Sequence, residues 1–278
     1  MMAFRAMGTQ VEVFEPGDGT GEAARAQFEA VEAACTRFRA DSDLSLVNGD
    51  IRERVVMPHL LSRVVGAAAE MRTRTGGLVD AAVGGAVAEW GYASSYESVT
   101  DLAEAPRCRE MPRWEVRGRT VVRPPGTVLD LGGIAKGWTA DRVVESRDAK
   151  VVSAGGDVRS AHRDTIVDVV GGDGKGAVRV HLGVGALATS STLRRTWNVG
   201  GTRVHHLIDP RVGSPAATPV TTASAICSTA VEAEAAAKAV VLLGADGLAW
   251  ADRQSWIRAA LVVWDDGSVY ATSGLEAA

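Results

Sequence analysis

Hydrophobic and polar positions along the chain follow the two periods that regular secondary structure imposes. The alternation in TQVEVFE, residues 9–15, predicts a half-buried strand, because successive strand side chains point to opposite faces. Apolar residues spaced three or four apart predict a helix over 22–40, and the polar stretch 41–50 that follows predicts a turn. The same helical spacing predicts further helices over 60–77, 134–147 and 231–244.

The middle and the end of the chain are rich in strand-like runs. Residues 101–126 hold four prolines with charges between short strand-like pieces, so we expect a loop and a hairpin there. Because helices and strands do not alternate strictly, the pattern favours an α+β fold with a largely antiparallel sheet over a doubly wound parallel one. The strand-like runs are TVLDL (127–131), KVVSAGG (150–156), TIVDVV (165–170), AVRVHL (177–182), TRVHHLID (202–209), IRAALVVW (257–264) and SVYAT (268–272).

The composition narrows the class of protein. A chain of 278 residues with 46% hydrophobic content can bury a large core, as one big domain or as two closely joined ones. Its net charge of −4 creates no basic field, so nucleic acid and anionic membrane are poor candidates as principal partners. No run approaches the roughly 20 apolar residues of a membrane span, and the first residues lack a secretory signal pattern. We therefore expect a cytoplasmic protein, and three widely separated cysteines suit a reduced compartment.

Two glycine-containing segments and one histidine pair are candidates for chemistry. In VLDLGGIAKGWTAD (128–141), glycines lead into a helix whose free backbone N–H groups suit a phosphate or diphosphate; a plain strand-to-helix turn is the alternative. The aspartate of SAGGD (153–157) is either a turn former or a ligand. In HHLIDPRVGSPA (205–216), His205 and His206 point to opposite faces of a strand. One of them is either a general base at a cleft or a structural histidine.

The apolar helix predicted over 231–244 carries two opposite charges on one stripe. Glu234 and Lys238 are four residues apart and flanked by apolar side chains. Thr229 and Glu232 form the sequence pattern of a capping box, so the start of the helix is well specified. An ordinary surface ion pair and a functional pair are both open interpretations of Glu234 and Lys238.

Eight segments in a fixed order cover nearly the whole chain. They are AMGT (6–9), FRADSDLSLVN (38–48), GLVDAAVG with EWGY (77–92), DLGGIAKGWTAD (130–141), SAGGD (153–157), ATSSTLRR (188–195), HHLIDPRVGSPA (205–216) and STAVEAEAAAKAVVLLG (228–244). Each segment is weak alone. In this order they make the chain resemble the FAD:protein FMN transferase family, also called the ApbE family.

The resemblance implies a fold and a reaction. The expected fold is α+β of the T-fold type, one domain over residues 1–278 with two closely packed lobes, largely antiparallel sheets with flanking helices, and FAD in a cleft between the lobes. The expected reaction moves FMN from FAD to a threonine of an acceptor flavoprotein and releases AMP with the help of Mg²⁺. A divalent cation suits this chemistry because negative charge develops on phosphate oxygens.

The resemblance also implies roles for individual residues. His206 matches the histidine near the reacting phosphate, a candidate catalytic base for the acceptor hydroxyl. Ala135, through its carbonyl, and Glu234 match metal ligands, and Lys238 stands at the third ligand position. The expected flavin contacts are Met7, Leu44, Leu78, Val79, Asp80, Gly132, Lys136, His205 and Ile208.

The chain departs from the family pattern at this metal site. The family has an aspartate and a threonine where this chain has Glu234 and Lys238. Glutamate keeps a carboxylate, but a protonated lysine has no lone pair and repels Mg²⁺. Either Mg²⁺ is absent and the ammonium replaces part of its charge, or Lys238 swings away. The segment LVDAAV (78–83) and Ser153 depart as well, because the family has an aromatic and a proline around its aspartate and usually an asparagine at 153.

Three functions are therefore open. The leading hypothesis is a protein that holds or sequesters FAD, with weak or lost Mg²⁺-dependent FMN transfer. The alternative is an active FMN transferase that uses a displaced Mg²⁺ or the lysine itself. A third is a flavin-dependent oxidoreductase, although the chain shows no nicotinamide fingerprint.

Overall fold

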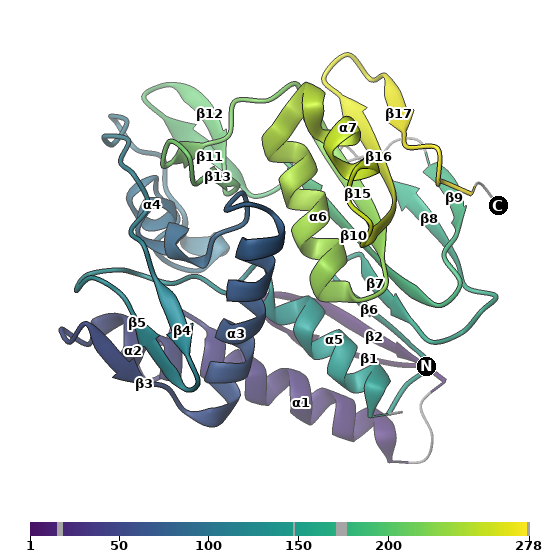
Figure 1. Ribbon diagram of the computed structural model, residues 1–278, viewed down its shortest axis with the longest axis horizontal. Helices are drawn as coiled ribbons and strands as arrows, with labels where there is room; N and C mark the ends of the chain where they lie inside the picture. Colours follow the sequence, from purple (N-terminus) through teal and green to yellow (C-terminus); the bar gives the residue numbers. More distant parts are fainter. Residues whose placement is uncertain (16–18, 147, 171–176, 277–278) are drawn as a thin grey trace. The chain divides into compact units, whose positions relative to one another are not determined.

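The structure is a computed structural model that describes residues 1–15, 19–146, 148–170 and 177–276. The chain forms two compact units, whose elements are coloured along the sequence in Figure 1. Unit 1 consists of residues 1–29, 136–193 and 217–278, and unit 2 consists of residues 30–135 and 194–216. Both units contain helices and antiparallel strands, which confirms the α+β class expected from the sequence.

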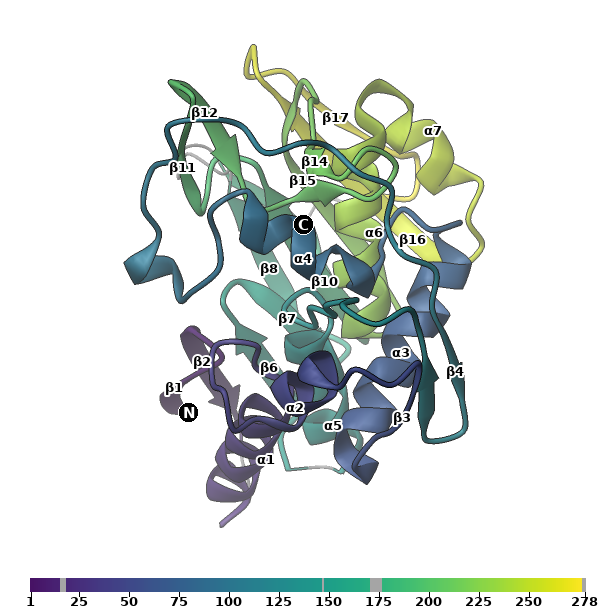
Figure 2. The ribbon, with the colours of Figure 1, turned by 90° about the vertical axis from the view of Figure 1, so that its left-hand side faces the viewer.

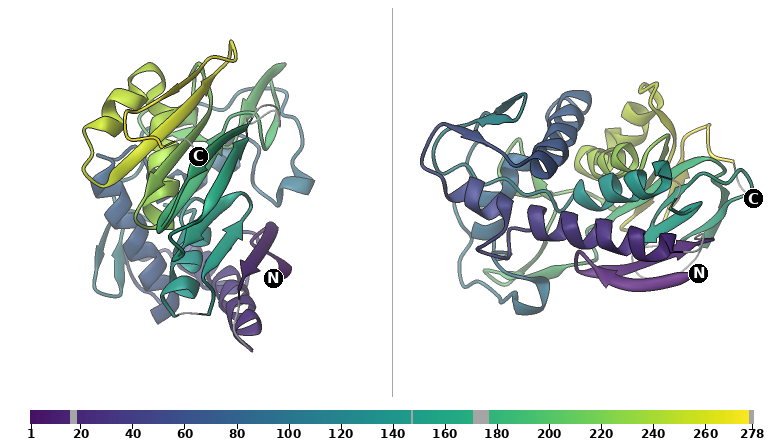
Figure 3. Two further views of the ribbon diagram at one scale, coloured as in Figure 1. Left: turned by 90° about the vertical axis from the view of Figure 1, so that its right-hand side faces the viewer. Right: turned by 90° about the horizontal axis from the view of Figure 1, so that it is seen from below.

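Unit 1 is built on an eight-stranded sheet in which every neighbouring pair is antiparallel. Its strand order is β1-β2-β6-β7-β10-β15-β16-β17, so the first and the last strand of the chain form its edges (Figure 3). The strands are β1 Met2–Ala6, β2 Thr9–Phe14, β6 Val151–Ala154, β7 Asp157–Ser160, β10 Gly185–Ser191, β15 Val220–Cys227, β16 Ile257–Trp264 and β17 Val269–Ala271.

Two tight hairpins shape one half of this sheet. Met7 and Gly8 join β1 to β2, and both have positive φ, 51° and 68°. Gly155 and Gly156 join β6 to β7 in the same way, with φ of 67° and 97°. Two-residue turns with two positive φ values match the twist of the strands that they connect. The glycines of SAGGD therefore reverse the chain and place Asp157 at the start of β7.

Apolar packing covers the other half of the sheet. Helix α6, Ala230–Leu243, lies in front of β10 and β15 in Figure 1, and eleven of its fourteen residues are buried. Strands β8, Ile166–Val170, and β9, Ala177–His181, form a hairpin that packs on the sheet through one apolar cluster. A helix buried almost all round is a core helix, so polar side chains on it need partners inside the protein.

Unit 2 has small antiparallel sheets around an aromatic core. Trp197 donates its indole N–H to the Trp90 carbonyl (2.7 Å), and Trp90 donates to the Gly213 carbonyl (3.0 Å). Figure 2 shows α3 beside the strands β3 and β4. The elements are α2 Asp43–Gly49, α3 His59–Arg74, α4 Gly84–Glu89, β3 Arg54–Val56, β4 Glu115–Arg117, β5 Thr120–Val122, β11 Thr196–Val199, β12 Thr202–His205, β13 Ile208–Asp209 and β14 Ser214–Pro215.

Two of the predicted elements are wrong. The stretch predicted as a turn over 41–50 contains helix α2, Asp43–Gly49, because the Ser42 hydroxyl caps the helix by accepting the Ser45 N–H (3.0 Å). Residues 127–131 are not a strand, since the Asn48 amide donates to the carbonyl and accepts from the N–H of Leu129, both at 2.9 Å. A side chain supplies the hydrogen bonds that a neighbouring strand would otherwise supply.

The predicted long helices are confirmed, with ends that shift by up to five residues, since the helix predicted to residue 40 ends at Cys35. These helices are α1 Thr20–Cys35, α3, α5 Ala135–Glu145 and α6. Residue 147, the last of the helix predicted over 134–147, lies outside the described residues. Within the part of the chain that the structure describes, no helix combines the length and the apolar character that crossing a membrane requires. The cytoplasmic location stays a prediction.

Candidate functional site

Four charged side chains meet inside unit 1. Lys136 comes from the first turn of α5, Asp157 begins β7, and Glu234 and Lys238 lie one turn apart on α6. Glu234 is only 2% exposed, which makes a surface ion pair the wrong interpretation of this residue. Because buried charges are costly unless they are paired, this charge cluster of Lys136, Asp157, Glu234 and Lys238 requires an explanation.

Lys136 is the link between the two acids of the charge cluster. Its ammonium donates to Glu234 Oε1 over a short distance and lies 3.3 Å from Asp157 Oδ2. Asp157 also accepts the Thr189 backbone N–H at 2.9 Å. Lys238 donates to the backbone carbonyl of Glu234 at 3.4 Å. Among the described residues, Glu234 Oε2 is buried without a hydrogen-bond partner.

The charges of the cluster depend on one another. Burial raises the pKa of Asp157 to about 6; Lys136 opposes this shift and Glu234 adds to it. Burial also acts to raise the pKa of Glu234, but the attraction of Lys136 and Lys238 outweighs it, so that the pKa is lowered. Glu234 is therefore the more firmly ionised of the two acids, and its charge is compensated by the two ammonium groups.

Gly137 and Asp141, one turn apart on α5, bring helices α5 and α6 together. At Gly137, a Cβ atom would lie only 2.8 Å from the Ala230 carbonyl oxygen and 3.0 Å from the Val231 nitrogen, so only glycine permits this approach. Four residues later, the Asp141 carboxylate accepts the N–H groups of Ala230 (2.8 Å) and Val231 (3.0 Å). Gly137 and Asp141 hold the first turn of α6, one turn before Glu234.

Sequence patterns did not reveal Asp141 as part of this arrangement. The residue is 6% exposed, and its carboxylate lies 2.9 Å from Arg159 Nε of β7. Burial raises the pKa of Asp141 to about 6, against the lowering effect of two backbone N–H groups and Arg159. The aspartate stands 89 residues before Ala230, whose N–H group it binds. Only the family-like spacing of GWTAD marks this residue in the sequence. The capping box of Thr229 and Glu232 is, in contrast, confirmed as predicted.

In unit 2, Asp80 holds three elements together. Its carboxylate accepts from Arg72 Nε (2.7 Å), from the Trp114 indole N–H (2.7 Å) and from the Ala82 backbone N–H (2.8 Å). The residue is 8% exposed. Its side chain therefore fixes the conformation of the segment around residue 80, and its expected contact with the flavin stays a prediction.

The histidine pair of unit 2 divides into one structural residue and one candidate base. Strand β12 ends at His205, so His206 lies in the bend beyond it and does not follow strand alternation. His205 is buried, accepts the Leu207 N–H at Nδ1 (3.2 Å) and has Nε2 3.1 Å from the Ala216 carbonyl. These contacts assign the proton to Nε2, and burial lowers the pKa of His205. His206 is half-buried, and its catalytic role stays a prediction.

The other residues expected at a flavin or metal site differ in exposure. The role expected of each residue stays a prediction, and so does the cleft expected to hold FAD. Met7 sits in the turn between β1 and β2, and the Gly132 N–H is held by Asp130 Oδ1 at 2.7 Å. Among the predicted residues, Glu234 contacts both Lys136 and Lys238. Leu44, Val79, Ala135 and Ile208 are buried; Met7 and Leu78 are half-buried; Gly132 is exposed.

The donor set of the charge cluster does not fit Mg²⁺. Mg²⁺ binds hard oxygen ligands at about 2.1 Å, but Glu234 Oε1 holds Lys136, and position 238 carries an ammonium without a lone pair. An ammonium about 4 Å from a doubly charged ion is repelled by about 8 kcal/mol at an effective dielectric constant of about 20. The described part of the chain contains no group of three or more His, Cys, Asp or Glu residues placed to hold a metal ion.

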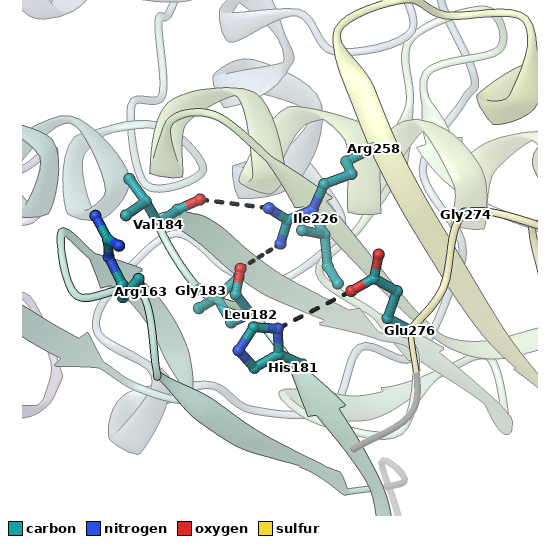
Figure 4. A pocket seen from close by; sticks show the side chains of 9 residues that line it. All are labelled: Arg163, His181, Leu182, Gly183, Val184, Ile226, Arg258, Gly274 and Glu276. Atoms are coloured by element: carbon teal, nitrogen blue, oxygen red, sulfur yellow. Dashed lines mark hydrogen bonds and ion pairs between the residues drawn. The ribbon is translucent and has the colours of Figure 1, made fainter.

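A separate pocket of about 280 Å³ lies elsewhere in unit 1 (Figure 4). Arg258 donates to the carbonyls of Leu182 (2.5 Å) and Val184 (3.3 Å) at its wall. His181 Nδ1 lies 4.0 Å from Glu276 Oε2 across it. The pocket is lined by none of the residues that the sequence predicts for the site.

Comparison with known proteins shows which family the sequence matches. The model of the ApbE family matches residues 7–261. A Rhodobacter capsulatus protein named FAD:protein FMN transferase is 32% identical over 78% of this chain, which spans 45% of that relative. A Treponema pallidum protein of the same name is 30% identical, and the match covers 88% of this chain and 76% of the relative.

Solved structures show the same fold. The ApbE protein of Thermotoga maritima superposes with a TM-score of 0.84 at 24% identity, over 98% of this chain and 96% of its own. The flavin transferase ApbE from Vibrio cholerae superposes with a TM-score of 0.81 at 23% identity, over the same shares of the two chains. At this level of identity the likeness concerns the fold, and it confirms the architecture expected from the sequence.

Proposed function

Because the chain belongs to the ApbE family, we propose that it is an FAD:protein FMN transferase, which moves FMN from FAD to a threonine of an acceptor flavoprotein. The family match over residues 7–261 and the transferase name of the relatives support this proposal. FAD is then a substrate, and AMP is the second product. The sequestration hypothesis gains no support from these relatives, so the alternative of an active transferase is preferred.

The observation that carries the proposal is the charge cluster of Lys136, Asp157, Glu234 and Lys238. Taking charges out of water is costly, and well-packed apolar residues would stabilise the fold as well or better. Interdependent charged groups with shifted pKa values are typical of catalytic sites. A protein that only stores FAD needs contacts to the flavin but no such cluster.

The proposed transfer exchanges one phosphate link for another. The acceptor hydroxyl attacks the phosphorus on the FMN side of the diphosphate, and the Oγ–P bond forms. The bond from this phosphorus to the bridging oxygen breaks, and AMP leaves with the electron pair. Negative charge increases on the phosphate oxygens in the transition state, so fixed positive groups accelerate the step. Lys136, held between two carboxylates, is such a group.

Two histidines have different parts in the proposal. His206 is the base that accepts the hydroxyl proton of the acceptor threonine. His205 is a positioning residue, because backbone groups occupy both of its ring nitrogens and hold the end of β12 just before His206. The flavin contacts expected from the resemblance are part of the same proposal.

The test follows both products. The purified protein is incubated with FAD and a peptide that carries an acceptor threonine, with and without Mg²⁺. AMP is quantified and the peptide mass is measured. We expect AMP and FMN-peptide in equal amounts, and neither product when the threonine of the peptide is replaced by valine.

Variants separate catalysis from binding. We expect His206→Ala to lower the transfer rate by about 100-fold or more, as for loss of a general base, and to leave FAD binding intact. His59→Ala is the matched control, because His59 is an exposed histidine at the start of α3. Retention of FAD without AMP or adduct, under both metal conditions and with several acceptor sequences, would refute transfer and favour storage.

A further inference from the structure

We propose that Lys238 takes the place of a divalent cation in this chain, so that FMN transfer proceeds without a metal ion. The inference rests on the transfer activity proposed above and extends it to the source of positive charge. It starts from the disagreement between the family's metal site and the side chains found there.

The charges of the cluster balance one another. The cluster contains two carboxylates, Asp157 and Glu234, and two ammonium groups, Lys136 and Lys238. The buried acids are therefore neutralised by groups of the chain itself. A divalent cation added among them would meet two like charges, and Glu234 Oε1 is already held by Lys136.

Helix α6 determines where Lys238 and Glu234 lie. Both come from α6, whose N-terminus is set by a capping box and by Asp141, so the start of the helix that carries them is fixed. The Lys238 ammonium donates to the Glu234 backbone carbonyl at 3.4 Å, which keeps it on the stripe of α6 that carries the carboxylate. Its attraction also acts on the Glu234 carboxylate itself. An ammonium fixed in this way is preorganised, and preorganised charge stabilises a transition state without reorganisation.

The length of the Glu234 side chain lets it reach another helix. The Glu234 carboxylate on α6 accepts a hydrogen bond from the ammonium of Lys136, which belongs to the neighbouring helix α5. Glu234 and Asp157 together hold this ammonium from two sides. We infer that Glu234 is a positioning residue for the ammonium groups. The ammonium groups of Lys136 and Lys238 are then the cationic donors available to oxygens of the FAD diphosphate, in place of a divalent cation.

The first experiment measures metal dependence of transfer. The protein is treated with EDTA and desalted, and AMP release from FAD with the acceptor peptide is measured in excess EDTA and in Mg²⁺. We expect equal rates within experimental scatter. A rate that rises about tenfold or more on adding Mg²⁺ would overturn the inference. Absence of AMP under both conditions would contradict the proposed function, which the product assay detects separately.

Variants at position 238 test the role of the ammonium. In EDTA, Lys238→Met should lower the rate by about 100-fold, as for loss of one charge-stabilising group, and Lys238→Arg should restore part of it. Lys150→Met is the matched control, because Lys150 is an exposed lysine that pairs with Glu15. Thermal unfolding is recorded for each variant, so that loss of activity is compared only among folded proteins. An unchanged rate in Lys238→Met contradicts the inference.

A binding measurement tests the site without any turnover. Mn²⁺ is titrated into FAD-free protein and the free ion is followed by electron paramagnetic resonance. We expect no stoichiometric Mn²⁺ site in the natural chain, and one site per chain in the double variant Glu234→Asp with Lys238→Thr. Stoichiometric binding by the natural chain would show that Lys238 does not exclude the metal. Failure of the double variant to bind Mn²⁺ would show that these two residues are not what decides metal binding.

Discussion

Replacing Asp141 is the sharpest test of how α6 is held. Asp141 is 6% exposed, and its carboxylate accepts two backbone N–H groups at the start of α6 and lies 2.9 Å from Arg159 Nε. Asp141→Ala leaves two donors and one guanidinium without this partner. A buried unsatisfied group costs about 1–3 kcal/mol. The three groups are neighbours, so their costs do not simply add. We therefore expect the free energy of unfolding of unit 1 to fall by about 2–4 kcal/mol, less than the sum of three separate costs.

The pH dependence of this residue distinguishes its charge from its hydrogen bonds. Burial raises the pKa of Asp141 to about 6, whereas an unfolded aspartate has a pKa of about 3.9. The folded state therefore binds this proton more tightly. The stability that protonation of Asp141 contributes to the folded state is fully present below about pH 3.9 and is lost as the pH rises through 6. At about 1.4 kcal/mol for each pKa unit, the loss amounts to about 3 kcal/mol.

Urea unfolding followed by circular dichroism at several pH values between 4 and 7 checks this expectation. We expect the stability of the natural chain relative to Asp141→Asn to fall by up to about 3 kcal/mol across this range, because asparagine does not ionise. Asp41→Asn is the matched control at an exposed acid. A difference between the natural chain and Asp141→Asn that stays flat or grows with pH would refute the reasoning.

Three further outcomes are expected. The depressed pKa of His205 means that stability present above about pH 6.5 is lost as the pH falls through the folded pKa, and His205→Gln should weaken this dependence in thermal unfolding scans. Among the thiols, the exposed Cys108 should react with a disulfide reagent in the folded protein, whereas burial raises the pKa of Cys35 to about 12, so Cys35 should react only after unfolding. Gly155→Ala should lower the free energy of unfolding by about 2 kcal/mol more than Gly156→Ala. Both positions have positive φ, but only at Gly155 would a Cβ atom lie 2.6 Å from a hydroxyl on β2. Equal losses would argue against a steric clash at Gly155.

The local elements of the chain are largely readable from its sequence. Periodic apolar spacing placed α3 and α6, and the pattern Thr229-x-x-Glu232 marked the capping box that the structure contains. These features depend on neighbours within one or two turns, so the information lies in the same short segment. The order of family-like motifs added the fold and the transferase family, which no single segment specifies.

Contacts between distant segments are what the sequence patterns missed. The run 127–131 has strand-like residues, but Asn48 supplies its hydrogen bonds, so no strand forms. Asp141 caps a helix that begins 89 residues later. One miss was local: Ser42 caps the start of helix α2, but the polar composition of the stretch led to the prediction of a turn.

The sequence by itself determined that a glutamate and a lysine stand one turn apart on an apolar helix, because helical spacing follows from order alone. It left open whether they pair on the surface or act in a site. The tertiary structure decided that Glu234 is buried and that its carboxylate binds Lys136 of another helix. The physical reason is that the partners of a buried charge come from whichever segments the packing brings near, and here Gly137 and Asp141 set that packing.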